Sequence, residues 1–169
     1  MTSRERVLAA LNHEEGDRVP IDLGGFQSGI HLRAYKELLD HLGLVEEIHV
    51  LDPVQQLAVP SEQVLERFHV DTRYVTAGAP ADFDGRIREN WRDGRLWHDL
   101  EDEFGVVWSM PGDQRLYMDI SHHPLADATV RDLEKYPFPK GDDPSRFAGL
   151  RERAKAITGD GCFALSSGI

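Results

Sequence analysis

A short stretch near the N-terminus holds the side chains best suited to chemistry. Asp22 lies two residues before the pair Gly24-Gly25, and Ser28 and His31 follow closely. A carboxylate beside a glycine turn can act as an acid or base or hold a polar ligand, and glycines allow close approach to the backbone. We therefore take Asp22 and His31 as candidate catalytic residues, and Gly24, Gly25 and Ser28 as candidate cofactor-binding residues.

Each of these residues also has a purely structural interpretation. Asp22 can accept backbone N–H groups from the glycine turn, Ser28 can cap a helix, and His31 can lie exposed in a first helical turn. Neither a G-x-x-x-x-G-K-[ST] nor a G-x-G-x-x-G pattern occurs, so the two glycines do not form a known phosphate loop. Both interpretations stay open at this point.

The sequence predicts no metal site within the chain. His122 and His123 are adjacent, and adjacent residues of a strand point to opposite faces, so they rarely bind one ion together. Cys162 is the single cysteine, which excludes an intramolecular disulfide and a thiolate cage. We expect Cys162 to pack within a strand.

Composition limits the possible functions. The chain has 169 residues, a formal net charge of −11 and 40% hydrophobic residues, as in a globular domain with a real core. The acidic balance argues against a nucleic-acid partner. Neither a run of about 18 apolar residues nor a signal-peptide stretch is present, so we expect no membrane partner and a cytoplasmic location.

The first half of the chain reads as helices and strands in alternation. Thr2 and Glu5 have capping-box spacing and begin a helix with an apolar stripe formed by Val7, Leu8 and Leu11. Alternating apolar residues then predict a strand over residues 19–23. Further helices are predicted over residues 31–42, from Asp52-Pro53, and again from Ser61, and a strand is predicted over residues 71–78.

The second half has a different pattern. Residues 86–121 contain the hairpin turn Asp93-Gly94 and all three tryptophans, and they predict an antiparallel β meander. The tryptophans either build a small satellite core or form an aromatic wall beside a ligand. Helices are predicted over residues 129–135 and 143–159. Residues 162–169 read as a buried parallel strand, so we expect missing neighbours beyond Ile169 and an incomplete active site in this chain.

The opening resembles the uroporphyrinogen decarboxylase superfamily. The residues that carry the resemblance are Thr2-Ser3-Arg4-Glu5-Arg6-Val7 and Asp17-Arg18-Val19-Pro20-Ile21-Asp22-Leu23-Gly24-Gly25. Later stretches are also similar to that superfamily, namely residues 28–31, 52–58, 123–128 and 132–137. The resemblance covers essentially all of residues 1–169, and its opening is the most specific part.

The resemblance implies an α/β fold. Residues 1–169 would be the N-terminal portion of a (β/α)8 TIM barrel with an N-terminal helix, and residues 86–121 would be an inserted antiparallel β meander. On the branch of cobamide-dependent methyltransferases, the full protein would move a methyl group from a methylcobamide to a thiol or similar acceptor. The expected partners are a corrinoid protein or a small-molecule methyl acceptor, with a homodimer as a further possibility.

Two departures favour this branch over the decarboxylase itself. The decarboxylase has an arginine-rich motif after its first strand, where this chain has residues 23–28 without arginine. It also has a Ser-Asp pair that ends its second strand, where this chain has Thr76-Ala77-Gly78. The methyltransferases hold zinc through a His-x-Cys motif that this chain lacks, so we expect zinc only from residues beyond Ile169.

Two other functions stay open. One is a decarboxylase-like carboxy-lyase that acts on a different carboxylated substrate, with Asp22 handling the proton. The other is a non-catalytic binding or half-barrel domain.

Overall fold

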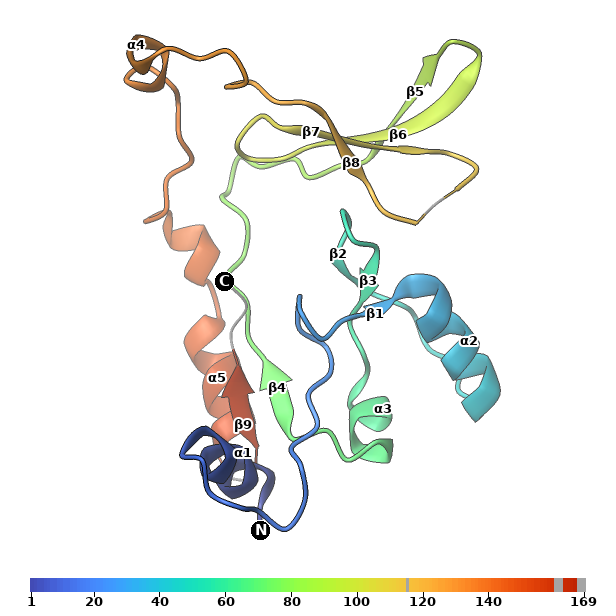
Figure 1. Cartoon of the computed structure of the whole chain (residues 1–169), viewed down its shortest axis with the longest axis vertical. Helices are drawn as coiled ribbons and strands as arrows, with labels where there is room; N and C mark the ends of the chain where they lie inside the picture. The colour runs from blue at the N-terminus through green and yellow to red at the C-terminus, as the bar shows by residue number, and fades with distance from the viewer. Residues whose placement is uncertain (115, 160–162, 167–169) are drawn as a thin grey trace. The chain divides into compact units, whose positions relative to one another are not determined.

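The chain folds as two compact units. The computed structural model describes residues 1–114, 116–159 and 163–166 (Figure 1). Unit 1 comprises Met1–Asp52, Leu57–Ala77 and Phe147–Ile169, and unit 2 comprises Pro53–Gln56 and Gly78–Arg146. None of the described helices is long and apolar enough to cross a membrane.

Unit 1 combines short strands with four helices among its described residues. The strands form an antiparallel sheet in the order β1-β3-β2 and a parallel pair of β4 with β9. A buried cluster of Tyr35, Leu39, Ala58 and Val64 forms its core. The elements are α1 (Ser3–Leu11), β1 (Ile30–His31), α2 (Leu32–Leu42), β2 (Val50–Asp52), β3 (Leu57–Ala58), α3 (Glu62–Arg67), β4 (Thr72–Tyr74), α5 (Leu150–Thr158) and β9 (Ala164–Ser166).

Helix α1 begins as predicted but buries a different face. The side chain of Thr2 accepts the N–H of Glu5, and the Glu5 side chain accepts the N–H of Thr2, which completes a capping box. The predicted apolar stripe is wrong, because Leu8 and Leu11 are exposed while Arg6 is buried. The helix is thus held to the unit by a charged residue.

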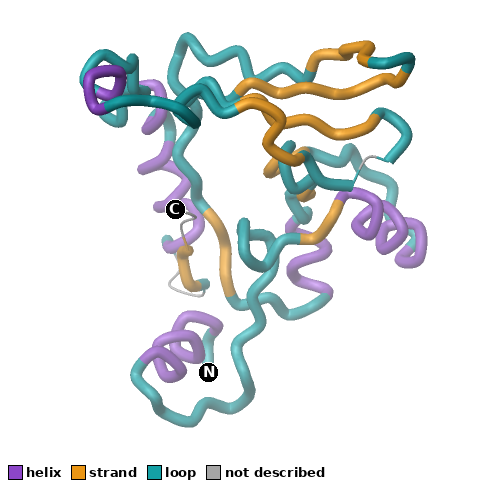
Figure 2. The backbone as a smooth tube through the Cα atoms, turned by 45° about the horizontal axis from the view of Figure 1, so that its top comes forward, coloured by secondary structure: helices purple, strands orange, loops and turns teal. Residues whose placement is uncertain are grey.

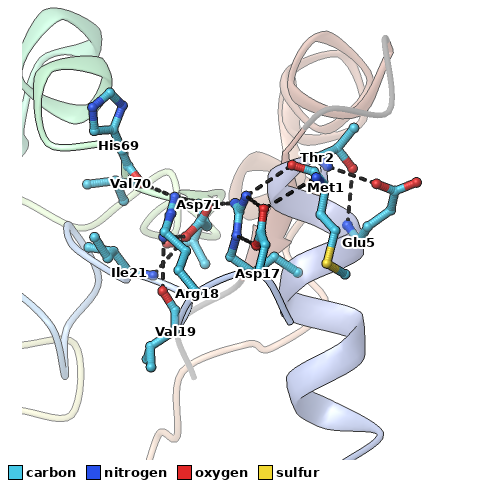
Figure 3. A network of polar contacts seen from close by, with 12 residues as sticks. Met1, Thr2, Glu5, Asp17, Arg18, Val19, Ile21, His69, Val70 and Asp71 are labelled. Carbon is cyan, nitrogen blue, oxygen red and sulfur yellow. Dashed lines mark hydrogen bonds and ion pairs between the residues drawn. The ribbon is translucent and has the colours of Figure 1, made fainter. Parts of the chain in front are cut away.

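Arg6 joins a network of polar contacts within unit 1, in which Figure 3 labels Asp17, Arg18 and Asp71. Its Nη1 lies 2.6 Å from Oδ1 of the fully buried Asp71, and its Nε lies 2.6 Å from Oδ1 of Asp17. Oδ2 of Asp71 also accepts from Arg18 Nη1 at 2.7 Å and from the N–H of Ile21 at 2.8 Å. Burial alone would raise the pKa of Asp71, but the bonds from Ile21, Arg18 and Arg6 outweigh it and hold the pKa below its usual range.

The predicted strand over residues 19–23 is wrong. This segment is extended but unassigned to a sheet, because Ile21 hydrogen-bonds to Asp71 through both the Asp71 carboxylate and the Asp71 backbone N–H. It ends at Gly24, whose φ of +102° favours glycine. The chain therefore enters the glycine turn from the Asp71 network rather than from a strand.

The helical predictions between residues 31 and 67 are confirmed in part. Helix α2 ends at Gly43 in the left-handed conformation, and Ser61 caps α3. The helix predicted to start at Asp52-Pro53 is wrong, because Asp52 ends β2 and a turn with Gln56 at positive φ leads into β3. Pairing of β3 with both β1 and β2 thus overrides the local helix-start pattern.

Unit 2 is built around the predicted meander. Strands β5 (Arg88–Arg92), β6 (Arg95–Glu101), β7 (Val107–Pro111) and β8 (Asp119–His122) form an antiparallel sheet in sequence order. Strands are drawn in orange in Figure 2. Asp93 and Gly94 both have positive φ, of 50° and 75°, as the predicted two-residue hairpin turn requires. The short helix α4 (Val130–Leu133) follows, with a capping box at Thr129.

The core of unit 2 lies on one face of this sheet. Leu100, Met110 and Met118 are buried together, and Trp108 packs against them. Trp91 is 69% exposed. The satellite-core interpretation of the tryptophans therefore holds for Trp108 and not for Trp91.

The C-terminal helix begins seven residues later than predicted, at Leu150. Pro144–Phe147 forms a 3-10 turn, η1. Gly149 then adopts a left-handed conformation with a φ of 66°, and α5 begins after it. Strand β9 then pairs in parallel with β4, from Thr72 with Ala164 to Tyr74 with Ser166. Cys162 lies outside the described residues.

The fold-class prediction of a TIM barrel is wrong. A barrel repeats parallel strands, each followed by a helix. Among the described residues, the three-stranded and four-stranded sheets are antiparallel, and parallel pairing is confined to β4 and β9. The physical reason is local, because tight turns such as Asp93-Gly94 fold the chain after β4 back into hairpins.

Candidate functional site

Asp22 lies at the centre of a polar cluster in unit 1. Its Oδ1 accepts a hydrogen bond from the Thr72 hydroxyl, and its Oδ2 accepts one from the Tyr74 hydroxyl at 2.7 Å. Thr72 and Tyr74 are two residues apart on β4, so the alternation of a strand points both toward the same side. Strand β4 thus presents two hydroxyls to one carboxylate.

The glycine turn closes onto the same cluster. The N–H of Gly24 donates to the Ser28 carbonyl at 3.1 Å, and the N–H of Gly25 donates to Ser28 Oγ at 3.3 Å. Ser28 Oγ also lies 3.4 Å from the Tyr74 hydroxyl. The structure therefore brings together Asp22, Gly24, Gly25 and Ser28, four of the five residues expected to form a site.

Gly25 makes room for a side chain of the protein itself. A Cβ atom added at Gly25 would lie 2.2 Å from Cζ of Tyr74, far inside van der Waals contact. The close approach expected at this glycine is thus made by the Tyr74 ring. The ring in turn carries the hydroxyl that donates to Asp22.

Arg73 lies between Thr72 and Tyr74 on β4, and its charge pairs with Glu62. Arg73 is buried, and its Nε lies 2.9 Å from a carboxylate oxygen of Glu62. Its guanidinium also lies 4.0 Å from the ring centroid of Phe163. Among the described residues no cation forms an ion pair with Asp22. Asp22 therefore differs from Asp71, because only neutral hydroxyl groups bind it.

The protonation of Asp22 follows from these contacts. Partial burial raises its pKa, but the hydroxyls of Thr72, Tyr74 and Ser28 stabilise the carboxylate and bring the pKa below its ordinary value. Asp22 is exposed despite these bonds, so a ligand can reach its carboxylate. An accessible carboxylate with a lowered pKa is a poor general base near neutral pH and a good hydrogen-bond acceptor.

His31 occupies a structural position at the start of α2. Its Nδ1 accepts the backbone N–H of Arg33 at 3.1 Å, which makes His31 the N-cap. It also belongs to β1, where it pairs with Leu57 of β3. The contacts defined here tie His31 to its own helix and to β3.

The described residues do not fit a zinc ion. No group of three or more His, Cys, Asp or Glu side chains among them is arranged to hold a metal. His122 and His123 are exposed, and Nδ1 of His123 accepts the N–H of Leu125 at 3.2 Å. Zinc chemistry would need ligands from elsewhere.

Thr72 and Tyr74 were missed as site residues in the sequence. They are 50 and 52 residues from Asp22, and Tyr74 reads simply as the centre of a buried strand. The available signal was their period-two spacing, which places two hydroxyls on one strand face. That signal identifies a polar face of the strand, but it does not show which distant residue packs against that face.

Comparisons with known proteins identify no family for this chain. No family model, no curated protein and no solved structure matches it significantly. The superfamily resemblance in the opening residues stays a prediction, and the candidate site rests on the geometry around Asp22.

Proposed function

We propose that this chain takes part in corrinoid-linked methyl transfer, with the Asp22 cluster binding the edge of a cobamide. One observation carries the proposal: Asp22 is an exposed, ionised carboxylate whose partners are neutral hydroxyls. A cobamide carries carboxamide side chains around its ring, and their N–H groups are donors that match a carboxylate. The bound cobamide would supply the methyl group.

The carboxylate has capacity left for such a ligand. Two carboxylate oxygens offer about four acceptor positions, and the hydroxyls of Thr72, Tyr74 and Ser28 occupy three of them. A donated amide N–H would form a charge-assisted hydrogen bond, which is stronger than a bond between neutral groups. The turn at Gly24 and the ring of Tyr74 hold the carboxylate in place before a ligand arrives.

The same geometry disfavours the decarboxylase-like alternative. A proton-handling carboxyl works best with a pKa near the working pH, and the contacts of Asp22 move its pKa the other way. The corrinoid interpretation needs only an acceptor at this position. A zinc-activated thiol acceptor, if used, would be held by ligands other than the described residues.

A spectral titration tests the proposal. Methylcobalamin is added to the whole chain, and binding is followed through its visible spectrum. We expect saturable binding that Asp22→Asn weakens about tenfold, the size of a lost bond to a charged group. The matched control is Asp40→Asn, which removes an exposed carboxylate of unit 1 that pairs with Lys36.

Two outcomes would contradict the proposal. One is the absence of any saturable spectral change with the unmodified chain. The other is equal loss of affinity in the Asp22 and Asp40 variants, because that would assign the effect to net charge. Thermal unfolding of both variants checks that they fold before affinities are compared.

A further inference from the structure

A groove crosses the face of the meander sheet opposite to its core. The groove has a volume of about 540 Å³ and is lined by β6, β7, β8 and the turn before β8. This size falls within the range of small-molecule sites. We call it the meander groove, and its main lining residues are Trp97, Ser109, Gln114, Tyr117, Asp119 and Ser121.

Strand register explains why the groove faces away from the core. Asp99 pairs with Ser109, and Ser109 pairs with Asp119, so these residues share one face of the sheet. Leu100 and Met110 alternate with them and form the core on the other face. The polar face is therefore left available to a ligand.

The floor of the groove is an ordered polar network. Ser109 is 4% exposed, its hydroxyl donates to Asp99 at 2.6 Å, and it lies 2.7 Å from Ser121 Oγ. Asp99 also accepts from Asn90 at 2.8 Å and from Arg92 at 2.6 Å. Because these bonds satisfy Asp99 internally, the floor is fixed without a ligand.

The Trp97 ring, which forms one wall of the groove, already has two cations beside it. The guanidinium carbons of Arg92 and Arg95 lie 4.6 and 5.6 Å from the ring centroid of Trp97. These cations use the negative potential of the indole face. Their own partners are Asp99 and Asp113. A cationic ligand would meet like charges at this wall, and a neutral ligand would not.

The rim supplies both kinds of hydrogen-bonding group. Asp119 is exposed, and within the described ranges its carboxylate forms no ion pair. The Gln114 amide can donate and accept, and Ser121 adds a hydroxyl. Tyr117 contributes a second, largely exposed ring. Acceptors, donors and flat apolar surfaces thus occur side by side.

We propose that the meander groove binds a neutral, hydroxyl-rich ring compound, namely a saccharide. The C–H face of such a ring packs on Trp97 and Tyr117, its hydroxyls donate to Asp119, and its oxygens accept from Gln114. This inference is independent of the Asp22 cluster, because every residue that it uses belongs to unit 2.

Protein-observed 1H–15N NMR on the whole chain tests the inference. The probes are methyl glycosides of glucose, galactose, mannose and N-acetylglucosamine, with tetramethylammonium as the cationic comparison. We expect at least one glycoside to bind in the millimolar range and to shift the Trp97 indole N–H signal, assigned through Trp97→Phe. Asp119→Asn should weaken that binding about tenfold.

A carboxylate on the opposite face provides the control. Glu89 is exposed on β5 and pairs with His98, next to the Asn90–Trp97 pair, so it points away from the groove. Glu89→Gln should leave glycoside binding unchanged. The inference is overturned if no glycoside shifts the Trp97 signal, if Asp119→Asn binds as well as the unmodified chain, or if tetramethylammonium binds more tightly than the glycosides.

Discussion

The contact between Gly25 and Tyr74 makes one residue pair essential to the Asp22 cluster. We expect Gly25→Ala to lower the free energy of unfolding by about 2 kcal/mol, because a methyl group there overpacks against the Tyr74 ring. Denaturant unfolding followed by far-UV circular dichroism measures the loss.

A double-mutant cycle separates this clash from a general effect of alanine. With Tyr74→Ala already present, Gly25→Ala should cost much less, because the ring that it meets is gone. An equal cost in both backgrounds would show that the ring is not the obstacle.

At this scale, the sequence predicts residues that are close together in the chain. Asp22, Gly24, Gly25 and Ser28 do meet, because a short turn joins them. The hydroxyl of Tyr74 comes from a strand about 50 residues away, and no local pattern reveals that approach. Burial of a charged helix residue also depends on partners distant in the sequence, which local periodicity does not contain.

Among the elements, the β5–β6 hairpin depends most clearly on its turn. Gly94 has a φ of 75°, and an added Cβ would meet nothing within 4 Å, so backbone strain alone opposes a side chain there. We expect Gly94→Ala to cost about 1 kcal/mol in the unfolding of unit 2, measured by tryptophan fluorescence.

Gly141→Ala is the matched control for this hairpin prediction. Gly141 is an exposed glycine of the same unit that also has nothing within 4 Å, but it has no positive φ. Its substitution should change the unfolding free energy by less than about 0.5 kcal/mol. Equal effects at both positions would contradict the strain argument.

Elements defined by local chemistry are the ones that the sequence predicts well. The capping box at Thr2, the glycine end of α2 and the Asp93-Gly94 hairpin each depend on residues within one turn. The expected helix at Pro53 and strand near Ile21 fail for the opposite reason. Asp52 pairs with β3, the carbonyl of Val54 accepts the N–H of the distant Met118, and Ile21 bonds to Asp71.

At the scale of the molecule, the TIM-barrel prediction is wrong because it rested on the resemblance to a family. It did not rest on evidence of which strands pair with which. The sequence of expected helices and strands suits more than one topology. Hairpin turns decide between them in residues 88–122, and they produce an antiparallel sheet. The parallel pair of β4 and β9 is the part of the described structure that agrees with a parallel arrangement.

The two units should respond differently to acid. The lowered pKa of the buried Asp71 contributes stability to unit 1 above about pH 4, and this contribution is lost as pH falls through the folded-state pKa. All three tryptophans belong to unit 2. We therefore expect amide exchange in α1 to rise on acidification before tryptophan fluorescence changes.

The Asp71→Asn variant checks the origin of this difference. It should lower the free energy of unfolding of unit 1 by about 3 kcal/mol at neutral pH, because Arg6 and Arg18 lose their buried anionic partner. Its remaining stability should then vary less with pH than that of the unmodified chain. A tryptophan transition that moves together with the α1 amides would show that the units unfold as one.

The pairing of β4 with β9 has a consequence for the order of events during synthesis. Residue 72 leaves the ribosome about 90 residues before its partner at 164, and Gly78–Arg146 of unit 2 is made in between. The hairpins of unit 2 are local contacts and can form while the chain is still growing. Unit 1 must wait for β9, so we expect β4 to complete its pairing after the hairpins of unit 2 have formed.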